Sequence, residues 1–439
     1  MRSERIWGIW ALTSETVPLS EFCTVRKGLS YKGEFIHKKG PALLGIGTIK
    51  EGGGFRPENV RTYGGPYKET HVLRPGDVYV ALTSQDGLLI GSPAMVPKDF
   101  QGIGITTHHD AKIDWKTEDQ DMKDFLYWLM HSYGFIRHCI NFSVGTTVYA
   151  THGKDVERFH VPKQLNHNQI RMTRILNSIS ELEKVLESTT KILEIRISSL
   201  FRSWFLDFDP VKAKAEGNLP YGMNEETAAL FPDSFEDSEL GSIPAGWKWG
   251  QLGECISVVG GGTPSTKNEV FWDGEYNWTS PKDLSNSNSI IMLDTEKTIT
   301  EKGLAKVSSG LLPADTVLMS SRAPIGYLAL TKIPVAINQG YIAIPPENNM
   351  SPNFMLSWIH YNMPLIEAYS SGSTFPEISK KEFRKLPILI PPAELIKKFK
   401  EKTTCLYDVM ETNLKQMNSL INTRDALLPR LMSGELKVN

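Results

Sequence analysis

The chain has 439 residues, of which 40% are hydrophobic and 22% charged, values ordinary for a soluble globular protein of two or three domains. The formal net charge of −2 argues mildly against a free-standing nucleic-acid binder, which usually carries a basic footprint, so in a DNA-binding role we expect partner subunits to supply much of the phosphate neutralisation. The four cysteines lie far apart without a CxxC pair, and no apolar run approaches the roughly 18 residues of a membrane helix. We therefore expect a cytoplasmic protein without a zinc site, a disulfide framework or a membrane partner.

The residue pattern predicts a mixed α/β (α+β) fold in which two β-rich domains each precede a long helix. In both domains, short runs of β-branched and aromatic residues are broken by Gly, Pro and Asn. Helical spacing of apolar residues predicts one helix near Met122–Ile140 in the first domain and one near Asn353–Ile366 in the second. The expected segments are an N-terminal tail (1–15), a first β-rich domain (16–165), a central helix (166–208), a connector (209–243), a second β-rich domain (244–392) and a C-terminal helix (393–439).

Both long helices carry apolar rows with the spacing of a coiled coil. The first is expected over about Gln169–Phe205, because apolar residues recur there at alternating intervals of three and four. Two amphipathic helices of similar length in one chain most simply pair with each other as an antiparallel coiled coil. About 36 helical residues span roughly 54 Å, so such a pair would act as a ruler between the domains. The predicted rows are Met172, Ile175, Ile179, Leu182, Leu186, Thr189, Leu193 and Leu200 with Arg196, and Ile396, Phe399, Thr403, Leu406, Met410, Asn413, Met417, Leu420, Leu427 and Leu431 with Arg424.

The two halves of the chain also repeat each other. Residues 143–147 (SVGTT) recur as 371–374 (SGST), with Gly145 and Gly372 aligned 227 residues apart. This period is too long for a solenoid, whose repeats run to about 20–50 residues. Two similar domains, each followed by a rod, favour recognition of a two-part target over chemistry in a single cleft.

Sequence motifs for catalysis are absent. There is no GxxxxGK[ST] loop, no HExxH helix, and no Asn-Pro-Pro-aromatic stretch for amino-methyl transfer. The glycine-rich stretch 260–266 offers either a backbone nest for a phosphate or a plain strand-ending turn, and the turn is favoured because no lysine stands where a P-loop needs it. His108, His109 and His152 lack further ligands at metal spacing, so a polar loop is favoured over a metal site. The sequence thus predicts a chain that is not an enzyme and holds no metal or cofactor.

In the second domain, Arg322 follows a predicted strand. An arginine there suits a bidentate contact with guanine or a clamp on a phosphate, and a structural ion pair with a carboxylate is about equally expected. Asn338 and Gln339 offer the amides that read adenine, and a turn cap is the alternative role for either. The candidate DNA contacts of this domain are Thr263, Lys267, Lys282, Ser321, Arg322, Asn338, Gln339, Ser373, Thr374, Lys380 and Lys381.

In the first domain, residues 105–109 (ITTHH) align with the stretch that holds Asn338 and Gln339, and residues 83–86 (TSQD) replace the loop that holds Arg322. Different polar residues in the same frame are what two domains reading different sequences would show. Small hydroxyls beside an aromatic residue and a lysine, just before the rod, suit either a DNA backbone contact or a turn that seats the domain on its helix. The candidates here are Lys27, Tyr31, Lys32, Ser84, Gln85, Thr106, Thr107, His108, His109, Thr146, Thr147, Tyr149 and Lys154.

Over nearly its whole length, the chain resembles the specificity subunit of type I restriction–modification enzymes. The most specific features are 321–326 (SRAPIG) with 337–340 (INQG), and 372–374 (GST) before 386–388 (LPI). The helix ends 200–208 (LFRSWFLDF) and 427–436 (LLPRLMSGEL) add to the likeness. The resemblance implies two target-recognition domains that each read one half of an interrupted double-stranded DNA site, and helices that set the spacer.

The same resemblance implies partner proteins. Two methyltransferase (modification) subunits, which bind S-adenosylmethionine and methylate adenine, would dock on the helices, and restriction subunits that use ATP and Mg would translocate and cleave DNA. The specificity chain itself would be non-catalytic. Two other hypotheses remain: a coiled-coil adaptor whose β-rich heads bind proteins, and an intact methyltransferase or nuclease, which the missing motifs disfavour.

Overall fold

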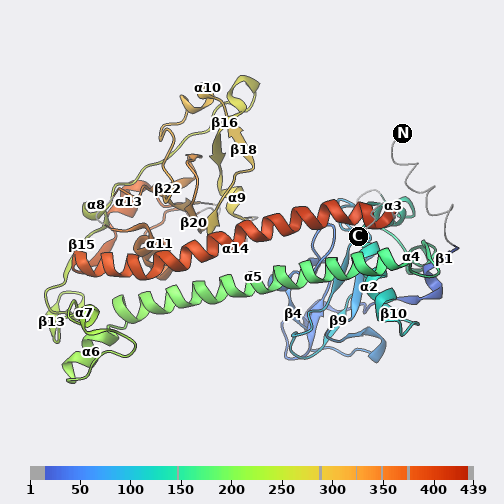
Figure 1. The fold of residues 1–439 in the computed structure, drawn as a ribbon. Helices are drawn as coiled ribbons and strands as arrows, with labels where there is room; N and C mark the ends of the chain where they lie inside the picture. The colour runs from blue at the N-terminus through green and yellow to red at the C-terminus, as the bar shows by residue number, and fades with distance from the viewer. Residues whose placement is uncertain are drawn as a thin grey trace. The chain divides into compact units, whose positions relative to one another are not determined.

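The computed structural model describes residues 15–145, 148–285, 289–322, 324–347, 350–372 and 376–433, with the side chains of 430–433 set aside. The chain divides into two compact units, and each is described by itself. Unit 1 comprises Met1–Glu183 and Ser419–Asn439, and unit 2 comprises Lys184–Asn418. The long helices α5 (His167–Phe205) and α14 (Ala393–Ser433) each contribute one part to either unit (Figure 1). No helix within the described ranges is both long enough and apolar enough to cross a bilayer.

The strands of unit 1 are β1 (Thr16–Pro18), β2 (Cys23–Lys27), β3 (Ala42–Leu44), β4 (Arg61–Thr62), β5 (Val72–Leu73), β6 (Val78–Ala81), β7 (Thr83–Ser84), β8 (Pro93–Met95), β9 (Gly104–Thr106), β10 (Asp110–Trp115), β11 (Tyr149–Ala150) and β12 (His160–Pro162). An antiparallel sheet has the order β2-β10-β6-β8, and a mixed sheet has the order β4-β3-β9-β5, in which β3 and β9 run parallel. Strand β6 buries Val78 and Val80 in one core and Tyr79 and Ala81 in another. This follows from the period of two, which sends successive side chains to opposite faces.

The helices of unit 1 that precede α5 are α2 (Gln120–Met130), α3 (Tyr133–Asn141) and α4 (Gly153–Glu157). The prediction of one helix near Met122–Ile140 is wrong, because α2 ends before Ser132 and a separate helix, α3, begins after it. The hydroxyl of Ser132 accepts a hydrogen bond from the backbone N–H of Phe135 (3.2 Å) and thereby caps α3. The 3-10 turns are η1 (Leu19–Glu21), η2 (Gly33–Phe35), η3 (Ile46–Thr48), η4 (Pro57–Asn59) and η5 (Glu69–His71).

The strands of unit 2 are β13 (Phe235–Ser238), β14 (Gly241–Pro244), β15 (Lys248–Gln251), β16 (Trp272–Thr279), β17 (Ile291–Met292), β18 (Lys297–Ile299), β19 (Val317–Ser321), β20 (Ile325–Thr331), β21 (Ala336–Ile337), β22 (Tyr341–Ile344) and β23 (Pro387–Ile390). A four-stranded sheet has the order β17-β20-β19-β22, and a three-stranded sheet has the order β18-β16-β21. Strand β19 buries Val317 and Met319 in one core and Leu318 in another, as β6 does in unit 1.

The shorter helices of unit 2 are α6 (Asp209–Ala215), α7 (Glu225–Ala228), α8 (Leu252–Cys255), η6 (Glu269–Phe271), α9 (Pro281–Ser285), α10 (Glu301–Leu304), α11 (Pro352–Tyr361), α12 (Met363–Ala368) and α13 (Lys380–Arg384). The helix expected near Asn353–Ile366 is divided at Asn362 into α11 and α12. The segment expected as a connector (209–243) carries α6, α7 and the β13–β14 hairpin, and it buries Val211 and Phe231 in the main core of the unit.

In unit 1, the first part of α5 and the last part of α14 run antiparallel. Leu427 and Leu428 pack against the core that holds Met172 and Leu176, and Arg424 Nη1 lies 3.4 Å from Glu183 Oε2. As the chain advances along α14, its residues therefore contact residues of progressively lower number in α5 and the core of unit 1. Leu176, outside the predicted row, is fully buried because the domain core, and not the partner helix alone, covers this face of α5.

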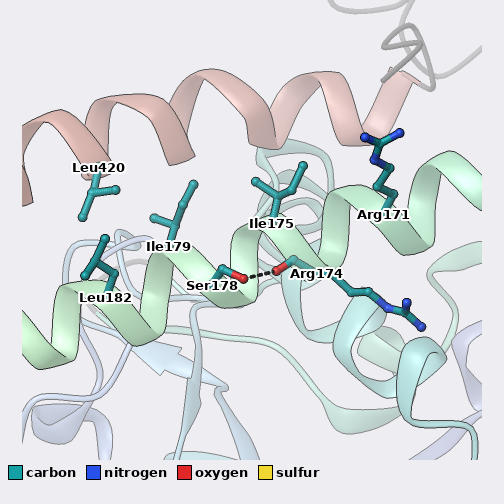
Figure 2. A pocket seen from close by; sticks show the side chains of 7 residues that line it. All are labelled: Arg171, Arg174, Ile175, Ser178, Ile179, Leu182 and Leu420. Carbon is teal, nitrogen blue, oxygen red and sulfur yellow. Dashed lines mark hydrogen bonds between the residues drawn. The ribbon is translucent and has the colours of Figure 1, made fainter. Parts of the chain in front are cut away.

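Between the two helices, unit 1 has an open hollow of about 350 Å³ (Figure 2). The predicted row residue Leu182 is 45% exposed there, although its neighbour Ile179 is buried. Arg174 pairs with Asp121 of α2 (3.0 Å), while its backbone carbonyl accepts a hydrogen bond from Ser178. The lining residues are Arg171, Arg174, Ile175, Ser178, Ile179, Leu182 and Leu420.

In unit 2, the end of α5 and the start of α14 also run antiparallel. The ring of Phe201 lies 5.8 Å from that of Phe399 and 5.3 Å from that of Phe354 on α11. Further along, Asn413 Nδ2 donates to Thr190 Oγ1 (3.3 Å). The predicted rows are thus partly correct: Met172, Ile179, Leu186, Ile396, Phe399, Thr403, Met410 and Asn413 are buried, whereas Arg196 is exposed.

Candidate nucleic-acid interface

Three segments of unit 2 meet at the end of β19. The backbone N–H of Ser321 donates to the carbonyl of Gly340 (2.8 Å), and the carbonyl of Ser321 accepts from the N–H of Ile378 (3.0 Å). The next residue, Arg322, forms an antiparallel bridge with Glu377. These bonds bring Arg322, the turn between β21 and β22, and the residues before α13 to one surface, although they are far apart in the sequence.

The predicted amides form a cluster on this surface. Asn338 Nδ2 donates to Thr263 Oγ1 (2.6 Å), and the Thr263 hydroxyl donates to Gln339 Oε1 (2.6 Å). Asn338 Oδ1 also accepts from the backbone N–H of Gly340 (2.7 Å), which is the turn-capping role named as its alternative. Thr263 and Gln339 remain exposed, so the cluster presents a hydroxyl and an amide whose positions are fixed by mutual hydrogen bonds.

The glycine-rich stretch lets this cluster form. A Cβ at Gly261 would lie 1.7 Å from the carbonyl oxygen of Ile337, and the N–H of Gly262 donates to that same oxygen (2.9 Å). The stretch is therefore a close turn against β21, and it carries Thr263 to Asn338. A Cβ at Gly260 would lie 2.7 Å from Nζ of Lys380, so this lysine belongs to the same surface.

Arg322 takes the structural role that was named as its alternative, in a weak form. Its Nη1 lies 3.8 Å from Glu377 Oε2, and the two side chains are 43% and 49% exposed. This separation is too long for a hydrogen bond, so the guanidinium keeps its donors for another partner.

The remaining candidates of unit 2 differ in accessibility. Ser321 is buried and donates to the carbonyl of Gly340 (3.0 Å), so its predicted role as a DNA contact is corrected to a structural one. Lys282 pairs with Glu296 (3.3 Å), while Lys267 and Lys381 are exposed. Ser373 and Thr374 lie outside the described residues.

In unit 1, the predicted residues Lys27, Tyr31, His108 and His109 gather around the start of β7, at Thr83. The rings of His108 and His109 lie 3.9 Å apart, and Tyr31 lies 5.7 Å from His108. His109 Nδ1 shares a hydrogen bond with Thr83 Oγ1 (3.0 Å). Burial first, and then the neighbouring His108 and Lys27, lower the pKa of His109 below its ordinary value of 6.5, which favours the neutral form of the ring.

Three predicted contacts of unit 1 are buried and are corrected to structural roles. Thr106 and Thr107 are 0% and 2% exposed, because their strand and the turn after it pack against the interior. Thr107 Oγ1 donates to the buried carboxyl of Asp110 (2.6 Å), whose pKa is raised well above its ordinary value by burial. Ser84 is 2% exposed, and its hydroxyl donates to Asp86 (2.5 Å).

The other candidates of unit 1 are exposed, and in the described part of the chain none of them forms a hydrogen bond or ring contact with the histidine cluster. They are Lys32, Gln85, Tyr149 and Lys154. Thr146 and Thr147 lie outside the described residues. In the parts that the structure describes, no group of three or more His, Cys, Asp or Glu side chains is placed to hold a metal ion.

The two units build these surfaces on the same backbone frame. In unit 1, the N–H of Leu82 donates to His109 (2.8 Å) and its carbonyl accepts from Thr151 (2.8 Å), as Ser321 does with Gly340 and Ile378 in unit 2. The bridges Val144–Ala150 and Ser371–Glu377 are also equivalent, with Gly145 and Gly372 both at positive φ (120° and 97°). The repeat found in the sequence is therefore matched in the structure by these equivalent backbone hydrogen bonds and bridges.

This frame gives an alignment that the sequence did not. Leu82 matches Ser321, so the residue that matches Arg322 is Thr83, and the sequence alignment of 83–86 with 321–324 was shifted by one position. Thr83 pairs with Ala150 in the sheet as Arg322 pairs with Glu377. Sequence reasoning missed Thr83, because a threonine in a strand carries no functional signal without this register.

A comparison with protein-family models matches residues 244–416 to "Type I restriction modification DNA specificity domain". The type I restriction enzyme MjaIX specificity subunit of Methanocaldococcus jannaschii is 33% identical over 186 residues, which are 42% of this chain and 43% of that protein. The HindI specificity subunit of Haemophilus influenzae is 27% identical over 309 residues, 60% of this chain and 66% of that protein. The matches thus span less than two thirds of these relatives.

Among solved structures, the S subunit of a type I restriction–modification system from M. genitalium aligns over 96% of both chains, with a TM-score of 0.57 and 15% identity. At this identity, the likeness concerns the fold. It agrees with the predicted mixed α/β architecture with two long helices.

Proposed function

We propose that the chain is the DNA-recognition subunit of a type I restriction–modification complex, because residues 244–416 match the model of the type I restriction modification DNA specificity domain. In this proposal, units 1 and 2 each read one half of an interrupted double-stranded site. The chain itself catalyses nothing and holds no cofactor. S-adenosylmethionine, ATP and Mg are used by partner subunits in the cytoplasm.

The proposal rests on one observation: the two units share the same backbone hydrogen bonds but carry different side chains on them. The equivalent hydrogen bonds of Leu82 and Ser321 hold the same three segments together in each unit. On that frame unit 2 presents Arg322 and Gln339, whereas unit 1 presents Thr83 and His108. Two domains that recognise unlike half-sites require different polar side chains on an equivalent backbone, because base edges are distinguished by their pattern of hydrogen-bond donors and acceptors.

The long helices support a role for partner proteins. α5 leaves several apolar side chains exposed: Leu182 in unit 1, and Val185, Ile192 and Ile195 in unit 2, at 45%, 58%, 64% and 65%. Apolar rows of this kind are usually covered by another protein. We assign them to two methyltransferase subunits, which would also supply phosphate contacts that a chain of net charge −2 lacks, and restriction subunits complete the complex.

Reconstitution with methyltransferase subunits of a type I restriction–modification system tests the proposal. Methylated adenines are mapped on a random-sequence DNA library, with omission of this chain as the control. We expect a motif of two unlike half-sites separated by a fixed gap. Methylation without a bipartite motif, or a motif that persists without this chain, would refute the proposal, and protein capture in place of DNA binding would favour the adaptor hypothesis.

A further inference from the structure

We propose that the Thr83–His109 pair is the base-reading element of unit 1, a specificity determinant that stands where Arg322 stands in unit 2. This inference rests on the proposed function and deepens it. The ligand is the edge of a base in the first half-site, read by a neutral imidazole. Nothing in the sequence pattern marks Thr83, and its assignment comes from the backbone register.

The register places the pair without ambiguity. Thr83 follows Leu82, whose N–H and carbonyl bond to His109 and Thr151 (both 2.8 Å). Arg322 follows Ser321, which makes the equivalent bonds to Gly340 and Ile378. Hence Thr83 corresponds to Arg322, and His109 corresponds to Gly340.

At these two positions, the side chains of unit 1 and unit 2 differ in both size and charge. Unit 2 has a long cation at the strand end and a glycine in the turn, whereas unit 1 has a short hydroxyl at the strand end and an imidazole in the turn. The carboxylate of Glu377 that faces Arg322 is replaced in unit 1 by Ala150, the sheet partner of Thr83. A charged donor with its counter-ion is thus replaced by a neutral donor–acceptor pair on the same part of the surface.

The hydrogen bond in this pair gives the imidazole a defined face. His109 Nδ1 is engaged by Thr83 Oγ1 (3.0 Å), and within the described ranges no hydrogen bond reaches its Nε2. When the threonine hydroxyl donates, Nε2 carries the proton and donates to guanine or thymine; in the other tautomer, Nε2 accepts from adenine or cytosine. The role of the Thr83 hydroxyl, donor or acceptor, is therefore coupled to which bases Nε2 can read. His108, at 3.9 Å between ring centroids, supports the ring from the side.

The test compares three variants in the reconstituted methyltransferase complex, with methylation motifs mapped on a DNA library. Thr83→Val removes the hydroxyl at nearly constant volume, His109→Ala removes the ring, and Thr83→Ser keeps the hydroxyl as the matched control. We expect Thr83→Val and His109→Ala to lose discrimination by about tenfold at one or two adjacent positions of one half-site. Thr83→Ser should keep the wild-type motif, and the other half-site should be unchanged in all three.

Retention of the wild-type motif by both Thr83→Val and His109→Ala would overturn the inference, as would an equal loss at both half-sites. His109→Ala removes a half-buried ring at a different position, so it provides a second test of the pair if Thr83→Val fails to fold. A wild-type complex that yields no bipartite motif would refute the proposed function itself. A bipartite wild-type motif that these variants leave intact refutes only the assignment of the pair.

Discussion

Replacement of Arg322 by alanine should weaken DNA binding far more than it destabilises the protein. The ion pair of Arg322 with Glu377 is 3.8 Å long, and both partners are nearly half exposed. Pairs of this kind contribute about 0–1 kcal/mol, so the free energy of unfolding should fall by less than about 1 kcal/mol. For the same reason, breaking this ion pair so that the guanidinium can contact DNA should cost little free energy.

The effect on binding follows from the chemistry of an arginine at a base edge. One bidentate contact discriminates by about 1–3 kcal/mol, which is roughly 5-fold to 150-fold in affinity. The loss should be confined to one or two adjacent base pairs of a single half-site. It should vary little with salt concentration, because base contacts, unlike phosphate contacts, release few counter-ions.

Competition binding on duplexes changed at one position at a time, with the full complex and at fixed salt, measures this loss. Glu377→Gln is the matched control: it removes the ion-pair partner and keeps the guanidinium, so binding should stay the same or become tighter. Equal loss on every duplex would make Arg322 a phosphate contact. No loss would remove it from the interface, and a large drop in melting temperature with no loss of selectivity would make it purely structural.

Three further predictions concern other parts of the chain. Gly261→Ala should disrupt selection at the second half-site but not the first, because the new Cβ would lie 1.7 Å from the carbonyl of Ile337; methylation mapping measures it. The pKa of half-buried His131 is lowered by desolvation from 6.5 to about 4, so its neutral form stabilises the fold above about pH 6.5. That contribution, up to about 3 kcal/mol, should be lost as pH falls toward 4, and denaturation curves should show a smaller loss for His131→Gln. Insertion of one heptad into both α5 and α14 adds about 10 Å and should widen the gap between the half-sites by about three base pairs; an unchanged gap contradicts the spacer role.

The long helices could be predicted from sequence because their signal is local and sustained. The period of three and four over some 36 residues fixed both helices to within a few residues of α5 and α14. The shorter helices were harder, since the apolar period runs on through Ser132 while the serine hydroxyl ends one helix and caps the next. A periodic row of apolar residues predicts which face of a helix is buried, but it does not predict where one helix ends and the next begins.

The candidate site agrees with the structure only where chemistry and exposure coincide. Arg322 and Gln339 were chosen for their side chains, and the structure leaves both exposed. Thr106 and Thr107 were chosen on the same chemical grounds, yet both are buried, because inward and outward positions of a short strand and its turn are not distinguishable in five residues of ITTHH. Thr83 was missed because its position follows from hydrogen bonds to a turn 26 residues away.

The shared frame also explains why these surfaces can differ without loss of the fold. In each unit the segments are joined by backbone N–H and carbonyl groups, as at Leu82 and Ser321, and every residue except proline carries that donor and acceptor. The side chains that point away from these bonds are therefore free to change, provided that their sizes remain complementary. The exchange of arginine and glycine for threonine and histidine meets this condition. A single substitution should therefore only weaken discrimination at this position, and a switch to another base should require paired changes at Thr83 and His109.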